Sequence, residues 1–159
     1  MNPTALYVHI PFCRQRCFYC DFAIAGDSAP VKERYVVALK QELAVWAQRG
    51  KSPLQTVFFG GGTPSLLSPA QLEDILAAIA EGFGIAAGAE VSLEANPGTL
   101  TAATARAWRG MGFNRVSLGV QAFQDELLAV CGRGTRWRRF TARWPRSKTP
   151  AWPTLIWIC

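Results

Sequence analysis

Short apolar stretches alternate with longer helical patterns along the first 134 residues. Four stretches have the length and composition of β-strands, at 5–10, 56–59, 90–94 and 115–119. Apolar residues at helical spacing predict helices over 31–48, from 68 past the stripe Leu72, Ile75, Leu76 and Ile79, over 101–110 and over 125–131. Four βα units in series predict an α/β fold with a parallel sheet and right-handed crossovers.

Three of the predicted strands have one apolar and one polar face, because side chains alternate along a strand. The polar faces carry Tyr7 and His9 in the first strand, Glu90, Ser92 and Glu94 in the third, and Arg115, Ser117, Gly119 and Gln121 in the fourth. A parallel sheet covered on both sides would instead show continuous apolar runs. The pattern therefore predicts a lined cavity, such as the inside of a wide partial barrel.

The bulk properties favour one domain and a cytoplasmic, soluble protein. The chain has 159 residues, enough to bury a core. It shows neither a signal-peptide pattern nor an unbroken run of some 18 apolar residues, so no transmembrane segment is expected. Its five cysteines, without an export signal, indicate metal or redox chemistry rather than disulfides.

The strongest chemical signal is the spacing C-x3-C-x2-C formed by Cys13, Cys17 and Cys20, directly after the first predicted strand. Three thiolates in one loop can hold a [4Fe–4S] cluster and leave one iron without a protein ligand. A structural zinc site with His9 as fourth ligand is the alternative, but zinc sites usually use paired C-x2-C knuckles. We therefore expect a cluster, with His9 in the core or supporting the site.

Four phrases resemble one known family. They are YVHIPFCRQRCFYCDF, FFGGGTPSLL, SLEANP and SLGVQAF, in this order, and they cover roughly residues 5–134. The sequence resembles the oxygen-independent coproporphyrinogen III oxidase-like branch of the radical S-adenosylmethionine (SAM) superfamily. Each phrase falls at or just after a predicted strand, so the motifs would meet at one end of the sheet, whatever the family.

The resemblance implies that SAM binds the open iron through its amino and carboxylate groups. One electron from the reduced cluster, supplied by an electron donor, then cleaves SAM to a 5′-deoxyadenosyl radical. It also implies the partial (β/α) barrel of the superfamily, here about its first four βα units, with the site at the carboxyl ends of the strands.

By the same resemblance, the positions that contact SAM are Tyr7, Tyr19, Gly61, Gly62, Thr63, Glu94, Gln121 and Arg133. For the glycines and for Glu94, the chemistry of the residues also supports contact with SAM. The glycines of 60–62 would let the main chain approach a ligand and offer its N–H groups to a carboxylate. Glu94, on the polar side of its strand end, could accept hydrogen bonds from the ribose or amino group of SAM. Trp46 and Trp108 are expected to pack inside, and Cys131 to be a small buried apolar residue.

The family offers two roles: a heme chaperone, and an oxidase that decarboxylates two propionates of coproporphyrinogen III. The start of the motif at residue 7 and the sequence CFYCDF at 17–22 resemble the chaperones. Heme or a porphyrin and heme-accepting proteins are then the expected partners. The chaperones' heme motif, a His-Asn pair followed by Tyr-Trp, is missing from this sequence. The oxidase and a zinc-binding interaction module are the alternatives.

The family pattern stops near residue 134. Residues 135–159 carry 6 basic and no acidic side chains, whereas 1–134 carry 11 of each, so the net charge of +6 lies wholly in this tail. The tail also holds four of the six tryptophans and has no helical or strand period. Interleaved Arg and Trp would suit single-stranded nucleic acid.

We favour a reading-frame error near residue 135 over nucleic-acid binding, because the change is abrupt. If no one- or two-base correction of the nucleotide sequence restores a helix and a strand beyond codon 134, this hypothesis is wrong.

Four βα units alone form an open half-barrel, whose last strand exposes an unpaired edge. We therefore expect weak folding or aggregation.

Overall fold

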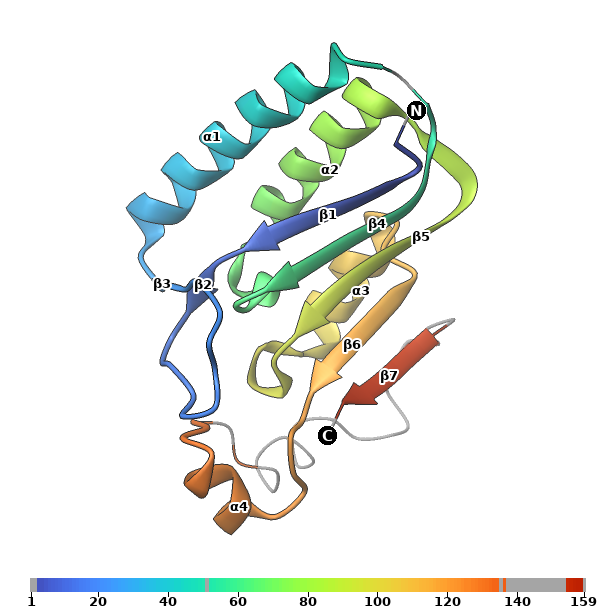
Figure 1. Ribbon diagram of the computed structural model, residues 1–159. Coiled ribbons are helices and arrows are strands. Elements are labelled where there is room, and N and C mark those ends of the chain that lie inside the picture. The colour runs from blue at the N-terminus through green and yellow to red at the C-terminus, as the bar shows by residue number, and fades with distance from the viewer. Residues whose placement is uncertain (1–2, 51, 135, 137–153, 159) are drawn as a thin grey trace.

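The computed structural model describes residues 3–50, 52–134, 136 and 154–158. Five parallel strands form one sheet in the order β1-β4-β5-β6-β7 (Figure 1). Their bounds are β1 (Ala5–Ile10), β4 (Leu54–Gly61), β5 (Ile85–Ala95), β6 (Arg115–Gly119) and β7 (Thr154–Ile158). Two short strands, β2 (Phe12–Cys13) and β3 (Ala25–Gly26), pair in parallel and bracket the loop that carries the cysteines. The predicted α/β fold with a parallel sheet is confirmed.

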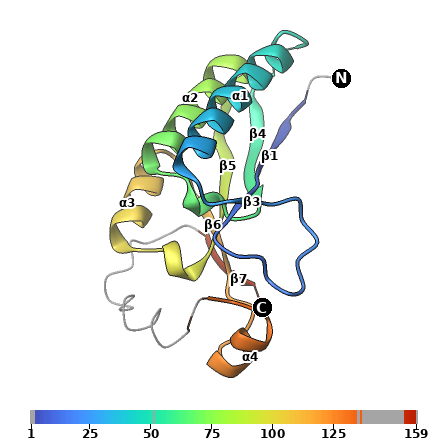
Figure 2. The ribbon, with the colours of Figure 1, turned by 90° about the vertical axis from the view of Figure 1, so that its left-hand side faces the viewer.

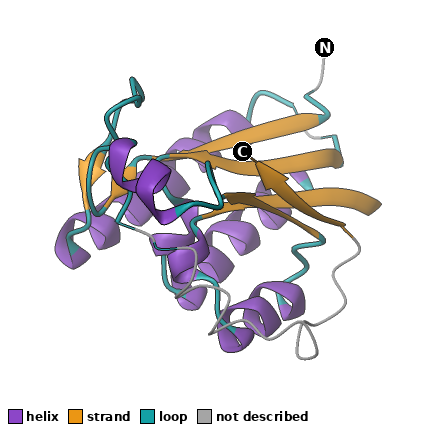
Figure 3. Ribbon diagram, turned by 90° about the horizontal axis from the view of Figure 1, so that it is seen from below, coloured by secondary structure: helices purple, strands orange, loops and turns teal. Residues whose placement is uncertain are grey.

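Three helices lie on one side of the sheet, as Figures 2 and 3 show. They are α1 (Ala29–Ala47), α2 (Pro69–Phe83) and α3 (Ala102–Gly110). Capping boxes begin two of them: Ser68 with Gln71 for α2, and Thr101 with Thr104 for α3. The short helix α4 (Asp125–Val130) lies beyond the carboxyl end of β6 (Figure 1). In the described part of the chain, no helix is both long and apolar enough to cross a bilayer.

The core lies between the sheet and these helices, and the predicted apolar strand faces supply it. Buried strand residues include Val8, Ile10, Val57, Phe59, Leu93, Val116 and Leu118. The predicted stripe Leu72, Ile75, Leu76 and Ile79 of α2 packs against them, as does the fully buried Trp108 of α3. Because the apolar faces turn toward the helices, the polar strand residues lie on the other face of the sheet.

The expectation that Trp46 packs inside is wrong. Its side chain is 51% exposed, and the guanidinium of Arg49 lies over its ring, 4.3 Å from the ring centroid. The face that α1 buries runs through Val36, Leu43 and Ala47. Ala47 lies one helical step beyond Trp46, about 100° round the helix axis, which turns the indole toward solvent.

The expectations of a tail without strands and of an unpaired edge on the fourth strand are both wrong. β7 pairs with β6 in parallel, from Arg115 opposite Thr154 to Gly119 opposite Ile158. Its sequence TLIWI is an apolar, β-favouring run that can satisfy the main-chain groups of β6. Residues 135, 137–153 and 159 lie outside the described residues, so the rest of the tail prediction stays a prediction.

Candidate functional site

A cavity of about 630 Å³ opens at the carboxyl ends of the central strands. Its walls come from the cysteine loop, from the turns after β4 and β5, and from the segments that follow β6 and α4. Among its lining residues are Cys13, Cys17, Tyr19, Cys20, Gly61, Gly62, Thr63, Glu94, Gln121 and Arg133. The structure thus brings together every predicted site residue except Tyr7.

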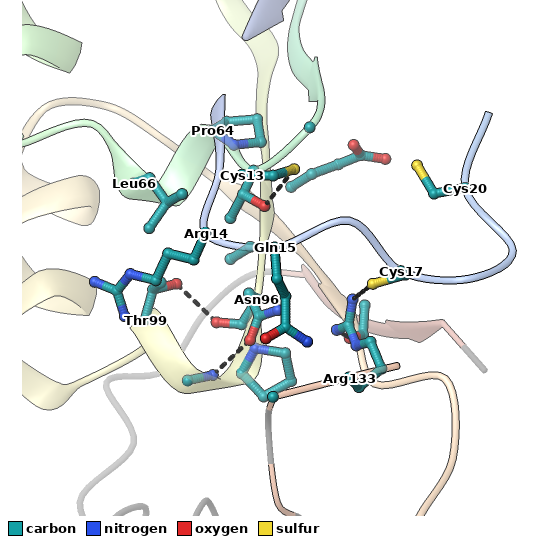
Figure 4. Close-up of a pocket in the computed structure, with 18 of the residues that line it drawn as sticks. Cys13, Arg14, Gln15, Cys17, Cys20, Pro64, Leu66, Asn96, Thr99 and Arg133 are labelled. Atoms are coloured by element: carbon teal, nitrogen blue, oxygen red, sulfur yellow. Dashed lines mark hydrogen bonds between the residues drawn. The ribbon is translucent and has the colours of Figure 1, made fainter. Parts of the chain in front are cut away.

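The three cysteines of the loop are half-buried free thiols at one end of this cavity (Figure 4). The Sγ of Cys13 lies 3.6 Å from the hydroxyl oxygen of Thr63, and Nη1 of Arg133 lies 3.9 Å from the Sγ of Cys17. Burial raises the pKa of the Cys13 thiol, and the contact with Thr63 opposes this effect. The loop therefore presents three sulfurs to one shared space, with a hydroxyl and a guanidinium beside two of them.

Three free thiols in one loop, facing one cavity, fit an iron–sulfur cluster. Among the described residues, no three His, Cys, Asp or Glu side chains lie close enough to share one ion. In a cubane each thiolate binds a different iron, so the three sulfurs need not converge on one point. The cavity extends beyond the cysteines toward Gly61, Gly62 and Thr63, which we call the glycine turn. This leaves space for a ligand on a fourth iron.

His9 lies outside the cavity. Its Nε2 is 3.3 Å from the carbonyl oxygen of Ala23, and its Nδ1 is 3.2 Å from the hydroxyl of Tyr7. A carbonyl can only accept, so Nε2 carries the proton and Nδ1 accepts from Tyr7. His9 therefore supports the end of the cysteine loop, as the sequence predicted, and both of its ring nitrogens are engaged away from the thiols.

Tyr7 is the predicted site residue that the structure leaves outside the cavity lining. Its ring stacks on Phe58 of the neighbouring strand, with the ring centroids 5.8 Å apart. Burial and the charge of Glu94 both raise the pKa of Tyr7. Tyr7 thus lies near Glu94, with β4 between their strands, but three residues before the end of β1, short of the cavity.

The glycine turn at the end of β4, residues 61–63, allows a close approach of main-chain segments. Gly61 has φ +110°, and a Cβ there would lie 2.6 Å from the His9 ring. A Cβ on Gly62 would lie 2.8 Å from both the carbonyl carbon and the oxygen of Pro11. Glycine is therefore required at both positions for the turn to pack against the start of the cysteine loop.

Glu94 links this turn to β5. Its Oε2 accepts a hydrogen bond of 3.2 Å from the main-chain N–H of Gly61. Burial raises the pKa of the Glu94 carboxyl, and the Gly61 hydrogen bond opposes the rise. A half-buried carboxylate with one main-chain donor can accept further hydrogen bonds from a ligand in the cavity.

A second polar network, which the sequence did not predict, joins the turns after β4 and β5. The buried Ser65 hydroxyl accepts from the Asn96 N–H at 3.2 Å and from the Thr99 hydroxyl at 2.7 Å. The Asn96 side chain accepts from the Gly98 N–H at 2.9 Å. The sequence signal for this network was a polar residue beside a proline just after a strand: Ser65 beside Pro64, and Asn96 beside Pro97.

Gln121 lines the cavity as predicted, whereas Cys131 differs from its expectation. Gln121 has φ +69°, the one described non-glycine residue with a positive φ, and it lines the cavity. Such backbone strain is often found at ligand sites. Cys131, expected to be buried, is half-buried, and its carbonyl accepts a hydrogen bond of 3.1 Å from the Phe18 N–H.

An ion cluster ties the start of the cysteine loop to α1. The carboxylate of Asp27 lies 3.2 Å from Nε of Arg14 and 2.6 Å from Nζ of Lys32. Lys32 also donates to the carbonyl of Leu66 at 3.1 Å. The hydrogen bond from Lys32, and then that from Arg14, lower the pKa of Asp27. The cluster thus connects the residue after Cys13 with the turn after β4.

This arrangement predicts a pH-dependent effect of Asp27→Asn. A carboxyl whose pKa is lowered by folding stabilises the protein above its unfolded pKa, about 3.9, and loses this effect as the pH falls through the folded value. We expect the variant to lose up to about 1 kcal/mol of unfolding free energy at pH 7, since Asp27 is partly exposed. The difference from the unsubstituted protein should be smaller below pH 3 than at pH 7, because the carboxyl becomes protonated as the pH falls through its lowered folded pKa. Urea unfolding at both pH values measures it.

Asp74→Asn is the matched control, because Asp74 is more exposed and lies 3.9 Å from Lys40. It should change stability little at either pH. A loss for Asp27→Asn that is equally large at pH 7 and below pH 3 would contradict an electrostatic origin.

Comparisons with known proteins agree with this geometry. Residues 7–143 match the Radical SAM superfamily. The chain is 54% identical over 144 residues to the heme chaperone HemW of Synechocystis, covering 87% of this chain and 35% of that protein. It is 42% identical over 139 residues to HemW of Escherichia coli, covering 84% and 36%.

A solved structure is also similar. Coproporphyrinogen III oxidase (HemN) from Escherichia coli, a radical SAM enzyme, matches with a TM-score of 0.80 and 33% identity, over 87% of this chain and 32% of that chain. The chain spans about a third of the length of these relatives.

Proposed function

The chain belongs to the radical SAM superfamily, and on this basis we propose that it forms the amino-terminal part of a heme chaperone of the HemW type. Membership implies a [4Fe–4S] cluster and SAM in general terms. The HemW proteins of two bacteria are similar along more than four-fifths of the chain, which supports the chaperone role. The proposal includes a cytoplasmic location, where ligand cysteines stay reduced.

The observation that carries the proposal is the position of Cys13, Cys17 and Cys20 at one end of a cavity whose other walls are the glycine turn and Glu94. In this proposal the three thiolates hold three irons of the cluster. The Gly61–Thr63 turn and Glu94 bind and orient SAM, together with Tyr19, Gln121 and Arg133. The cluster, when bound, supplies one-electron chemistry toward SAM, and the protein's part is to position the pair and exclude water.

Oxidase activity on coproporphyrinogen III is the second candidate, and the similarity to HemN favours it. Both roles require the same cluster and SAM site, so this part of the chain supports both. Heme binding separates them. The heme motif of the chaperones is missing from this sequence, so binding in a heme titration followed by the Soret absorption would show a heme site among these residues and support the chaperone role. Conversion of coproporphyrinogen III would support the oxidase instead.

The central test is anaerobic reconstitution with iron and sulfide, followed by electron paramagnetic resonance (EPR) of the reduced protein with and without SAM. We expect about four irons per chain and a signal that SAM perturbs, because one iron is accessible. Uptake of zinc alone, or a cluster signal that SAM leaves unchanged, would contradict the proposal.

Glu94→Gln should weaken SAM binding. The substitution keeps the shape of the side chain and removes the charge that accepts from the ligand, and a hydrogen bond to a charged group contributes roughly 1.5–3 kcal/mol. We therefore expect the SAM concentration that gives half of the EPR change to rise about tenfold or more. Iron content should stay unchanged.

Glu90→Gln is the control for this variant. Glu90 lies on the same strand face but bonds to Ser92 at 2.6 Å and to Arg115 at 2.9 Å. It does not line the cavity, so its substitution should leave the SAM response in place. Equal effects of both substitutions would assign the change to general electrostatics rather than to contact with SAM.

A further inference from the structure

Arg133 links three parts of the site that are far apart in the sequence. Its Nη2 donates to the carbonyl of Gly119, at the end of β6. Its Nη1 lies 3.9 Å from the Sγ of Cys17 and 3.5 Å from the hydroxyl of Tyr19. The hydrogen bond to Gly119 fixes the plane of the guanidinium, so its charge lies beside the sulfur of Cys17 (Figure 4).

The surroundings of Arg133 strengthen its field at that sulfur. Its Nε is buried and has no partner among the described residues, and screening by water is weaker for partly buried charges. No acidic side chain is paired with Arg133 among the described ion pairs, whereas Arg14 and Arg16 lie beside Asp27 and Asp21. Among the described residues, the charge of Arg133 therefore faces the cysteine loop without a side-chain carboxylate to offset it.

We propose that Arg133 raises the reduction potential of the cluster by donating an N–H to the sulfur of Cys17. This inference rests on the proposed function, since it requires the cluster. Reduction adds one electron from an external low-potential donor, and no covalent bond forms or breaks. A fixed positive charge and a hydrogen bond to a ligand sulfur both stabilise the extra negative charge of the reduced cluster.

The test is a redox titration of the reconstituted protein with dithionite, followed by EPR and without SAM, so that any role of Arg133 in SAM binding does not enter. Arg133→Gln should shift the midpoint to a more negative potential. We expect at least about a tenfold change in the one-electron equilibrium constant, which is 59 mV. Arg133→Lys keeps the charge, but lysine cannot donate to Gly119 and Cys17 in the fork geometry of arginine. This variant should shift the midpoint potential in the same direction, but by less than Arg133→Gln.

Arg16→Gln is the matched control, because Arg16 precedes Cys17 and carries the same charge. Its Nε donates to the carbonyl of Cys20 at 3.1 Å, and its side chain is 61% exposed. It should shift the midpoint far less than Arg133→Gln does. If both glutamine variants shift it equally, or neither does, the inference is wrong.

The possible failures are distinguishable. Absence of any cluster in the unsubstituted protein would refute the proposed function itself. If Arg133→Gln fails to assemble a cluster while the unsubstituted protein succeeds, Arg133→Lys decides the question. A midpoint for the lysine variant equal to that of the unsubstituted protein would then overturn the role of the N–H donor.

Discussion

Cys17→Ala is expected to leave the protein without a SAM-responsive cluster signal after anaerobic reconstitution. Cys17 is the central member of the three cavity cysteines, and its thiol is half-buried beside Arg133. Two thiolates would leave a second iron without a protein ligand, open to loss or exchange. We expect the iron content to fall severalfold and the EPR signal that SAM perturbs to disappear.

Cys131→Ala is the control for this loss. Cys131 is also a half-buried free cysteine, but it does not line the cavity. The variant should keep both the iron content and the SAM response. A normal cluster in Cys17→Ala would refute the ligand assignment, and a loss in both variants would point to general damage to the fold.

Gly62→Ala is expected to destabilise the protein and displace the cysteine loop. The added Cβ would meet the carbonyl group of Pro11 at 2.8 Å and the oxygen of Phe12 at 2.9 Å. These are main-chain atoms, which cannot move aside like the end of a flexible side chain. Overpacking of this kind costs roughly 1–3 kcal/mol. Because Cys13 follows Phe12 directly, we expect the SAM response of the cluster to be lost as well.

Urea unfolding of the cluster-free protein measures the loss of stability, and EPR with SAM measures the functional effect. Gly110→Ala serves as the control, since a Cβ at Gly110, the last residue of α3, meets nothing within 4 Å. It should be neutral or slightly stabilising, because alanine restricts the unfolded chain. If Gly62→Ala unfolds at the same urea concentration as the unsubstituted protein, the close packing of the turn is not required.

Local patterns sufficed for most of the fold. β1 and β6 have the predicted bounds, because clear alternation and turn residues mark both ends. β4 and β5 are longer than predicted: β4 continues into Gly60 and Gly61, and β5 begins at Ile85. Glycine favours turns on average, but here pairing with β1 keeps it in the ladder, opposite His9 and Ile10. Such pairing depends on the neighbouring strand and cannot be predicted from one segment.

The site was predictable where side-chain chemistry is local and not where it depends on distant contacts. The cysteine spacing and the glycine turn are each continuous in the sequence. The position of Tyr7 depends on the order of strands, which puts β4 between it and Glu94. The contact between Arg133 and Cys17 joins residues 116 positions apart. The hydrophobic pattern of neither segment indicates that these two residues are close in space.

The cysteine loop rests on a turn that is made late in the chain. Gln15 donates to the carbonyl of Gly132, and the N–H of Phe18 donates to Cys131. During synthesis, the thiols therefore leave the ribosome more than a hundred residues before the segment that holds their loop in place. In the proposed function, the loop therefore takes the shape that receives iron and sulfide only after residues 131–132 have emerged and docked, and until then the thiols must stay reduced.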